Sequence, residues 1–253
     1  MDITFYILGS VIVVSLVSLV SVLSLSLGQA SLARTLAFLV PLAVGALLGD
    51  AFFHLIPESF DGAGNPTTAS LGIILGIVSF FFLEKFLRWH HHSAEGSSAE
   101  IENVNKKHLG GLVLVSDSLH NFIDGVIIGV SYLVSIEVGI ATTIAIVMHE
   151  IPQEMGDFGV LIYAGYSKVL AILYNFLSAL TAIVGALLVI FLGSLSEQWI
   201  HGVTSFAAGV FIYIASSDLV PELHKNVAGK NLLPEIMGIG IGLVAMYLML
   251  LLG

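Results

Sequence analysis

Eight long apolar tracts divide this sequence and limit its fold more than any other feature. Each tract is close to the roughly 20 residues that a helix needs to cross the hydrocarbon core of a bilayer. They lie near residues 4–27, 36–57, 69–87, 109–133, 138–163, 169–192, 200–221 and 232–252. Because 57% of the 253 residues are hydrophobic and only 10% are charged, little polar surface is left for a water-soluble globule. We therefore predict an all-α integral membrane protein with eight transmembrane helices, in which residues 1–253 form one transmembrane domain.

The basic residues lie on only one side of these eight tracts. No Lys or Arg precedes the first tract, so we expect it to be a retained span and not a removable signal. All eight basic residues lie in or beside the first, third, fifth and seventh connections: Arg34, Lys85, Arg88, Lys106, Lys107, Lys168, Lys225 and Lys230. The positive-inside rule places those connections in the cytoplasm and both termini outside it. We expect a multi-pass protein of the plasma membrane, as in a bacterial inner membrane.

Two of the predicted spans end in a similar motif. The second span ends in HLIPE at residues 54–58, and the seventh ends in DLVPE at residues 218–222. In the predicted topology these two motifs face opposite sides of the membrane, as an inverted repeat would require. We therefore predict a 3+2+3 arrangement, in which spans 1–3 and spans 6–8 form an inverted pseudo-repeat around spans 4 and 5.

Spans 4 and 5 carry polar residues near the middle of the bilayer. At 3.6 residues per turn, His120 and Asp124 share one face of span 4, while His149 and Gln153 share one face of span 5. Five acids also lie in these two spans: Asp117, Asp124, Glu150, Glu154 and Asp157. If all five were ionised and faced lipid, the free energy of inserting them into the membrane would be unfavourable by about 12 to 18 kcal/mol. Since residues 109–163 include no Lys or Arg, a divalent metal ion or protons must balance them.

The types of side chain in this cluster limit which metal it suits. The chain has no cysteine, so only nitrogen and oxygen ligands are available. Two imidazoles with carboxylate and amide oxygens suit Zn²⁺ and its first-row neighbours, whereas Ca²⁺ and Mg²⁺ prefer oxygen alone. The net charge of −10 disfavours nucleic acid as a partner. We also expect Gly125 and Gly156 to let a neighbouring helix or a ligand approach closely.

Three further polar groups each allow two interpretations. Asp50, His54 and Glu58 are either an access route or an interfacial cap at the outer end of span 2. By the same reasoning, the polar residues at the inner end of span 7 are either an exit route for the metal or an interfacial cap. A cytoplasmic loop at about 90–107 either gathers metal or is simply a solvated polar segment. The exit residues are Asp218, Glu222 and His224, and the loop residues are His90, His91 and His92. Asp117 and Asp157, beside the central cluster, are further possible pathway residues.

Two segments of the central spans resemble a known family. HNFIDG at 120–125 and HEIPQEMGD at 149–157 are similar to the HNFxDG and HExPHExGD motifs of Zrt/Irt-like (ZIP) divalent-metal transporters. Weaker similarity at 49–58, 176–186 and 206–223 extends the resemblance over nearly the whole chain. The resemblance implies a homodimer that moves divalent metal ions, Zn²⁺ above all, toward the cytoplasm. The departure from the family pattern at Gln153 is what predicts Fe²⁺, Mn²⁺ or Cd²⁺ as further cargo. The inverted repeat favours alternating access as the means.

The resemblance also implies roles for individual residues. The transport site would use His120, Asp124 and His149, with Gln153 where the family usually has His. A second site would use Asn121, Asp124 and Glu150, with Glu154 close by. Because an amide oxygen is a poorer Zn²⁺ ligand than an imidazole, Gln153 predicts weaker metal retention or broader selectivity.

Two other functions compete with metal transport. HEIPQ at 149–153 nearly matches the HExxH motif of an intramembrane metalloprotease, but the second His of that motif is missing. A proton-coupled metabolite transporter could use the same acids and histidines as a proton relay. It would need a pocket for an organic substrate, and the cluster has no Arg or Lys to hold one. We therefore expect a carrier of metal ions that has no catalytic cofactor and is not an enzyme.

Overall fold

The computed structural model describes residues 3–22, 29–62, 65–89, 99–192, 197–225 and 232–252, and the elements within these ranges are helical. The α-helices in chain order are α1 (Ile3–Val17), α3 (Gln29–Asp50), α4 (Ile56–Gly62), α5 (Pro66–Trp89), α6 (Ala99–Val134), α7 (Ile136–Tyr163), α8 (Lys168–Ala179), α9 (Thr181–Leu192), α10 (Glu197–Tyr213), α11 (Val220–Lys225) and α12 (Leu233–Leu252). A 3₁₀-helix, η1 (Ser18–Val20), extends α1, and two π-helices, η2 (Ala51–Leu55) and η4 (Ile214–Leu219), continue α3 and α10.

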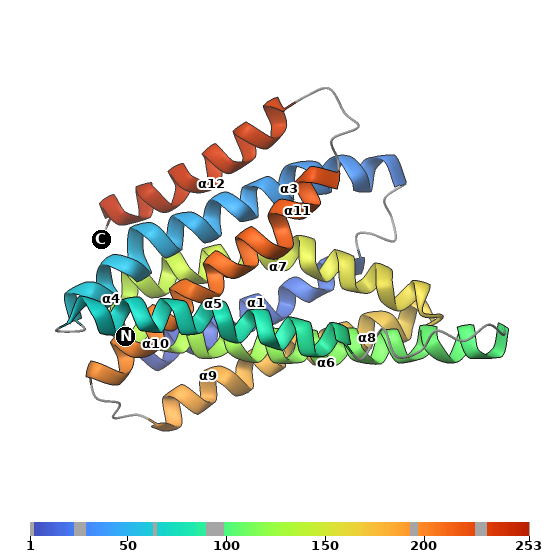
Figure 1. Ribbon diagram of the computed structural model, residues 1–253, viewed down its shortest axis with the longest axis horizontal. Coiled ribbons are helices and arrows are strands. Elements are labelled where there is room, and N and C mark those ends of the chain that lie inside the picture. Colours follow the sequence, from blue (N-terminus) through green and yellow to red (C-terminus); the bar gives the residue numbers. More distant parts are fainter. Residues whose placement is uncertain are drawn as a thin grey trace.

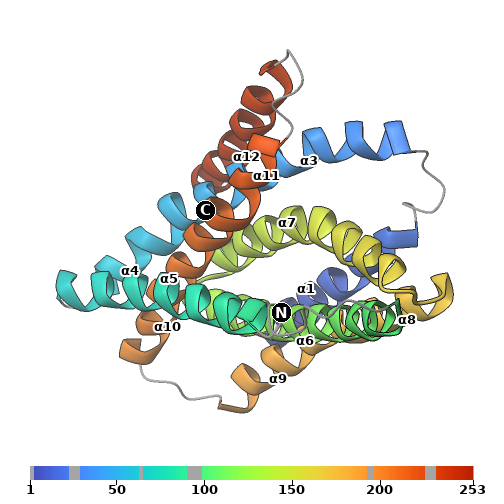
Figure 2. The same ribbon diagram turned by 45° about the vertical axis from the view of Figure 1, so that its right-hand side comes forward.

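Seven stretches of the described residues are long and apolar enough to cross a bilayer. They are Ile3–Val20, Arg34–Asp61, Pro66–Lys85, Val113–Val134, Lys168–Leu192, Gln198–Ser217 and Leu233–Leu251. The remaining long helix is α7, which has 28 residues but carries four acids. It is shielded by contacts with α1, α3, α6 and α8, and Figures 1 and 2 show it between α1 and α3. The prediction of an all-helical, multi-pass membrane protein is confirmed.

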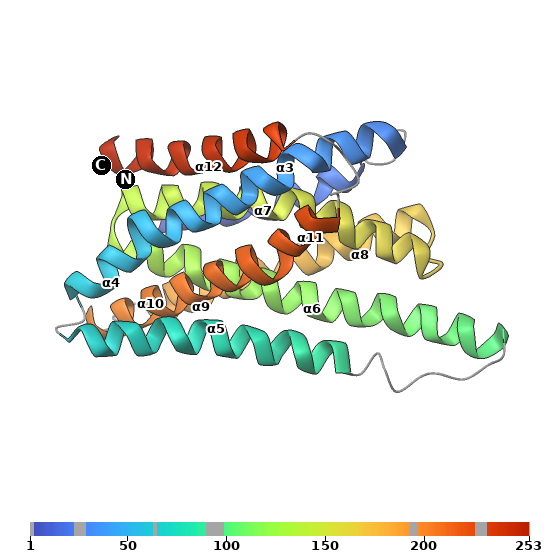
Figure 3. The same cartoon turned by 45° about the horizontal axis from the view of Figure 1, so that its top comes forward.

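The helix ends that carry basic residues gather at one end of the bundle. The start of α3, the end of α5, the starts of α6 and α8, and α11 all lie in the right-hand half of Figures 1 and 3. The sequence places the Lys and Arg residues of the described ranges in these segments. The beginning of α1 and the end of α12 lie together at the opposite end. The one-sided charge distribution is therefore a property of the folded chain as well as of the sequence.

The outer spans pack in two pairs. The helix α12 lies along α3, and α5 lies along α10 (Figure 3). Span 2 thus pairs with span 8, and span 7 pairs with span 3, which is how two inverted copies of three spans would pair. The main hydrophobic core joins these pairs to α6 and α7 through buried residues such as Leu47, Ile127, Ile146 and Phe211.

Each of the two π-helices ends within one of the two similar motifs and includes its first two residues. In η2 the Ile56 amide donates to the Ala51 carbonyl, and in η4 the Val220 amide donates to the Ala215 carbonyl. Each donor directly precedes a proline, Pro57 or Pro221. A proline inside a helix has no N–H and clashes with the carbonyl four residues back, and a π turn widens the helix at that point. The sequence analysis did not predict these two irregular turns.

The polar segment before span 4 is shorter than expected. Residues 99–107, predicted to lie in a loop, instead form the first turns of α6. Glu100 and Glu102 lie in the sequence of this helix start, where negative charge is favourable. The start of α6 extends past the rest of the bundle in Figures 1 and 3. His90, His91 and His92 lie outside the described residues, so their predicted role is not tested.

Candidate metal centre

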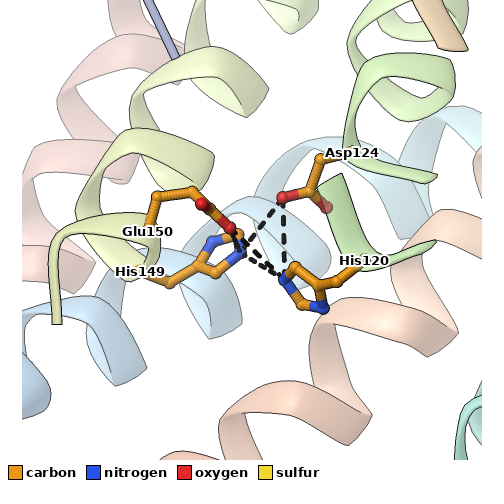
Figure 4. Close-up of side chains that lie close together, drawn as sticks. All are labelled: His120, Asp124, His149 and Glu150. Atoms are coloured by element: carbon orange, nitrogen blue, oxygen red, sulfur yellow. Dashed lines mark hydrogen bonds and ion pairs between the residues drawn. The ribbon is translucent and has the colours of Figure 1, made fainter. Parts of the chain in front are cut away.

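Four side chains from the two central helices converge inside the bundle. His120 and Asp124 lie one turn apart on α6, and His149 and Glu150 are neighbours on α7 (Figure 4). One ligand atom from each of them lies within 4.8 Å of the corresponding atoms of the other three. His120 is 9% exposed, and the other three are at most 1% exposed. The four residues therefore form one compact, buried group.

The distances within this group match those between the ligands of a tetrahedral zinc ion. The Nε2 atoms of His120 and His149 are 3.1 Å apart. Asp124 Oδ2 lies 3.7 and 3.2 Å from these two nitrogens, and Glu150 Oε1 lies 3.5 and 3.4 Å from them. Zinc bonds of about 2.0–2.2 Å put tetrahedral ligands about 3.3–3.6 Å apart. The nitrogen–nitrogen and nitrogen–oxygen distances are therefore close to those around one zinc ion, and the four atoms all lie within 4.8 Å of one another.

Neighbouring groups orient the two imidazoles. His149 Nδ1 lies 3.2 Å from the Ala145 carbonyl oxygen, so this nitrogen donates and Nε2 keeps a free lone pair for a metal. The Phe80 ring of α5 packs edge-on to His120 at 5.9 Å, and the Phe211 ring of α10 packs similarly against His149 at 6.2 Å. The sequence analysis missed both aromatic residues, because an aromatic that faces this site has no sequence signal that separates it from one that faces lipid.

The two carboxylates at this site are balanced only if the two imidazoles are protonated or a cation is bound. Within the described part of the chain, the carboxylate oxygens of Asp124 and Glu150 accept no hydrogen bond. Residues 109–163 contain no Lys or Arg that could pair with them. Buried carboxylates without donors or counter-charge are strongly unfavourable. The arrangement therefore favours a bound cation, and its two nitrogens favour a transition metal.

The other residues predicted at the metal site lie around this group. Asn121 Nδ2 lies 2.9 Å from Asp117 Oδ1 and donates to it. The carboxylate of Glu154 accepts a hydrogen bond from Asn175 of α8. Gln153 is half-buried, one turn beyond His149, and makes no hydrogen bond within the described ranges. Of the second site implied by the family resemblance, Asp124 and Glu150 join the histidines, whereas the Asn121 amide nitrogen faces Asp117.

The predicted access residues of span 2 form a buried cluster with α7. Asp50 Oδ2 accepts a hydrogen bond from Thr142 at 2.9 Å, and Asp50 Oδ1 lies 3.1 Å from His54 Nδ1. Asp50 is 0% exposed and His54 is 6% exposed, so neither side chain caps an interface with water. Glu58 is half-buried on α4. Thr142 was missed because a threonine in an apolar span is usually bonded to its own helix.

The remaining pathway residues are less fully described. Asp157 is half-buried on α7, one turn beyond Glu154. The backbone of η4 and α11 includes three further predicted residues, whose side chains fall outside the described part of the structure: Asp218, Glu222 and His224. The exit predicted at the end of span 7 is therefore not tested.

Of the two glycines expected to allow close approach, Gly125 lies against a neighbouring helix and Gly156 does not. A Cβ on Gly125 would lie 1.9 Å from the Ala182 carbonyl oxygen, so a glycine is needed where α6 meets α9. A Cβ on Gly156 would meet nothing within 4 Å among the described residues, so no helix approaches closely there, and the expected approach of a ligand is not tested. The close contact at Gly125 lies next to Asp124 and holds α6 against α9 at the depth of the metal site.

Comparison with known proteins identifies the family. A family model described as ZIP Zinc transporter matches residues 2–111 and 90–250. The chain belongs to the ZIP family. This membership agrees with the resemblance at residues 120–125 and 149–157. The geometry of the site also disfavours the metalloprotease alternative, since the imidazole that meets His149 comes from His120 of another helix and not from an HExxH motif.

Several ZIP relatives are similar over most of this chain. The metal cation symporter ZIP14 of Xenopus tropicalis is 33% identical in an alignment 261 positions long, which covers 76% of this chain and 55% of that protein. The zinc transporter YKE4 of Saccharomyces cerevisiae is 31% identical over 237 residues, covering 84% and 68%. The human zinc transporter ZIP6 is 39% identical over 142 residues, covering 56% and 19%. The chain thus spans about half the length of ZIP14 and a small part of ZIP6.

Proposed function

We propose that this ZIP-family chain carries divalent transition-metal cations across the membrane, with Zn²⁺ as the main cargo. The observation that carries the proposal is the buried convergence of His120, Asp124, His149 and Glu150 at zinc-ligand spacing. Relatives over most of the chain are named as zinc transporters or as metal cation symporters. Fe²⁺, Mn²⁺ and Cd²⁺ are further candidate cargoes, because Gln153 replaces a stronger nitrogen ligand at the edge of the site.

The metal would move toward the cytoplasm through polar groups on both sides of this site. On one side lies the buried cluster of Asp50, His54 and Thr142, with Thr142 two turns from His149 on α7. On the other side lie Asp117 and Glu154, toward the helix ends that carry basic residues. The pairing of spans 2 with 8 and 7 with 3 supports an inverted repeat, and an inverted repeat supports alternating access.

We further propose a plasma-membrane location with both chain termini outside the cytoplasm and a homodimeric carrier without enzymatic activity. The orientation rests on the positive-inside rule, because the basic helix ends gather at one end of the bundle. Dimerisation rests on the family alone. The exit at Asp218, Glu222 and His224 and the metal-gathering role of His90, His91 and His92 also stay proposals.

Uptake of radiolabelled Zn²⁺ into proteoliposomes tests the transport function. Native protein should take up Zn²⁺, whereas His120→Ala and Asp124→Ala should reduce the rate at least about tenfold, as expected for the loss of a metal ligand. His201→Ala is the matched control, because His201 lies at the start of α10 and outside the four-residue group. Equal uptake by all four proteins would refute the proposal. A pH gradient imposed in the same assay tests whether protons are coupled to the metal.

A further inference from the structure

A second polar cluster lies where α8 meets α6 and α7. Asn175 and Ser178 lie three residues apart on α8 and so share one face of that helix. The Ser178 hydroxyl donates to the carboxylate of Asp117 on α6, and the Asn175 amide donates to the carboxylate of Glu154 on α7. The helix α8 therefore bridges two acids that belong to different helices. The sequence analysis assigned no role to Asn175 or Ser178.

This cluster contains buried oxygen atoms that lack partners. Asn175 and Glu154 are 0% exposed, and Asp117 is 2% exposed. Within the described residues, Glu154 Oε1 and Asn175 Oδ1 are buried and accept no hydrogen bond. Burying such oxygens without a donor is unfavourable, and more so for a carboxylate. The nearest stretch of chain, residues 109–163, supplies no Lys or Arg, and α8 has only Lys168 at its first position.

We propose that Asp117, Glu154, Asn175 and Ser178 form a second cation site, made only of oxygen ligands, which takes a hard divalent cation. It lies about one helical turn from the histidine site, because Asp117 precedes His120 on α6 and Glu154 follows Glu150 on α7. A cation there would supply the partner that Glu154 Oε1 and Asn175 Oδ1 lack. The site stands on these contacts alone and does not require that the histidine site transports metal.

The ligand types separate this site from the histidine site. Two carboxylates carry a formal charge that one divalent cation balances. Carboxylate, amide and hydroxyl oxygens suit Mn²⁺, Ca²⁺ and Mg²⁺, whereas the two imidazoles of the first site suit Zn²⁺. The two sites should therefore fill with different metals when both metals are present. A cation bound at the oxygen site should also hold α8 more firmly against α6 and α7.

Binding of Mn²⁺ to the purified full chain, preloaded with one equivalent of Zn²⁺, tests the proposal. Free Mn²⁺ is measured by electron paramagnetic resonance. The native chain should bind one further Mn²⁺, and the double variant Asn175→Leu, Ser178→Ala should weaken that binding at least about tenfold. Asn175→Asp adds a carboxylate to the site and should tighten Mn²⁺ binding, which a misfolded chain cannot do.

His149→Ala separates this proposal from the transport function. It should lower the Zn²⁺ affinity of the histidine site and leave the Mn²⁺ affinity of the oxygen site within about twofold of native. Three results would overturn the second site: no Mn²⁺ binding by the native chain, binding unaffected by both α8 changes, or loss of Mn²⁺ binding in His149→Ala. None of these results depends on Zn²⁺ uptake, so either proposal can fail while the other stands.

Discussion

The imidazole of His120 on α6 faces that of His149 on α7, with their Nε2 atoms 3.1 Å apart. His149 donates through Nδ1 to its own helix, which leaves its Nε2 lone pair directed at His120. Asp124 and Glu150 approach the same pair of nitrogens from α6 and α7. A metal ion at this position would be shared by all four groups, and the first two predictions rest on this geometry.

Loss of His149 should weaken Zn²⁺ binding much more than loss of Gln153. His149 Nε2 lies within 3.4 Å of three other ligand atoms, whereas Gln153 makes no hydrogen bond within the described part of the chain. We expect His149→Ala to lower the affinity at least about tenfold and Gln153→Ala to lower it less than about threefold, measured by calorimetry in detergent. Equal losses would show that Gln153 is a ligand of comparable importance.

Gln153→His should raise the preference for Zn²⁺ over Mn²⁺. An imidazole one turn beyond His149 on α7 would add a nitrogen ligand at the edge of the site. We expect the ratio of Zn²⁺ to Mn²⁺ affinities to rise by about tenfold, or about 1.4 kcal/mol. Competition binding with both metals measures this ratio. An unchanged order and ratio of metals would contradict the role given to Gln153 in selectivity.

Gly125→Ala should destabilise the fold, whereas Gly156→Ala should not. The added Cβ at Gly125 would lie 1.9 Å from the Ala182 backbone oxygen, so α6 and α9 would have to separate. We expect a cost of about 3 kcal/mol, seen as a lower melting temperature in detergent. Gly156 is the matched control, since its Cβ would meet nothing within 4 Å. Similar melting temperatures for both variants would mean that the α6–α9 contact is looser than described.

Thr142→Val should destabilise the chain more than Thr143→Val. Thr142 donates across helices to the buried Asp50 carboxylate, so its loss leaves that oxygen without a donor. This loss should cost about 1–3 kcal/mol. Thr143 donates only to the Gly139 carbonyl of its own helix, so its replacement should change stability by less than about 1 kcal/mol. Chemical denaturation of both variants in detergent measures the difference, and the reverse order would contradict the Asp50–Thr142 contact.

Cysteine labelling tests the orientation of the chain across the membrane. Since the chain has no cysteine, single replacements report on one position each. Thr68 and Lys168 are exposed and lie in the first turns of α5 and α8, which start at opposite ends of the bundle. A membrane-impermeant maleimide added to intact cells should label Thr68→Cys and not Lys168→Cys, and both should react after lysis. Labelling of only Lys168→Cys in intact cells would reverse the proposed topology.

The sequence by itself determined the membrane fold and the helices of the metal site. Hydrophobic length marks a span whatever its neighbours are, and the cost of five acids in lipid requires spans 4 and 5 to face inward. Helical periodicity also places His120 with Asp124 on one face, because both residues belong to one helix. The location of the Lys and Arg residues on one side of the spans was also predicted without tertiary information.

Only the tertiary structure decided which residues from different helices meet. Periodicity placed Gln153 on the same face of α7 as His149, and the packing of α7 against α6 brings Glu150 to the two histidines, which periodicity did not predict. Thr142, Asn175 and Ser178 gained partners on other helices for the same reason. Contacts between helices depend on how each helix is rotated and how closely it packs, and sequence periodicity within one helix specifies neither.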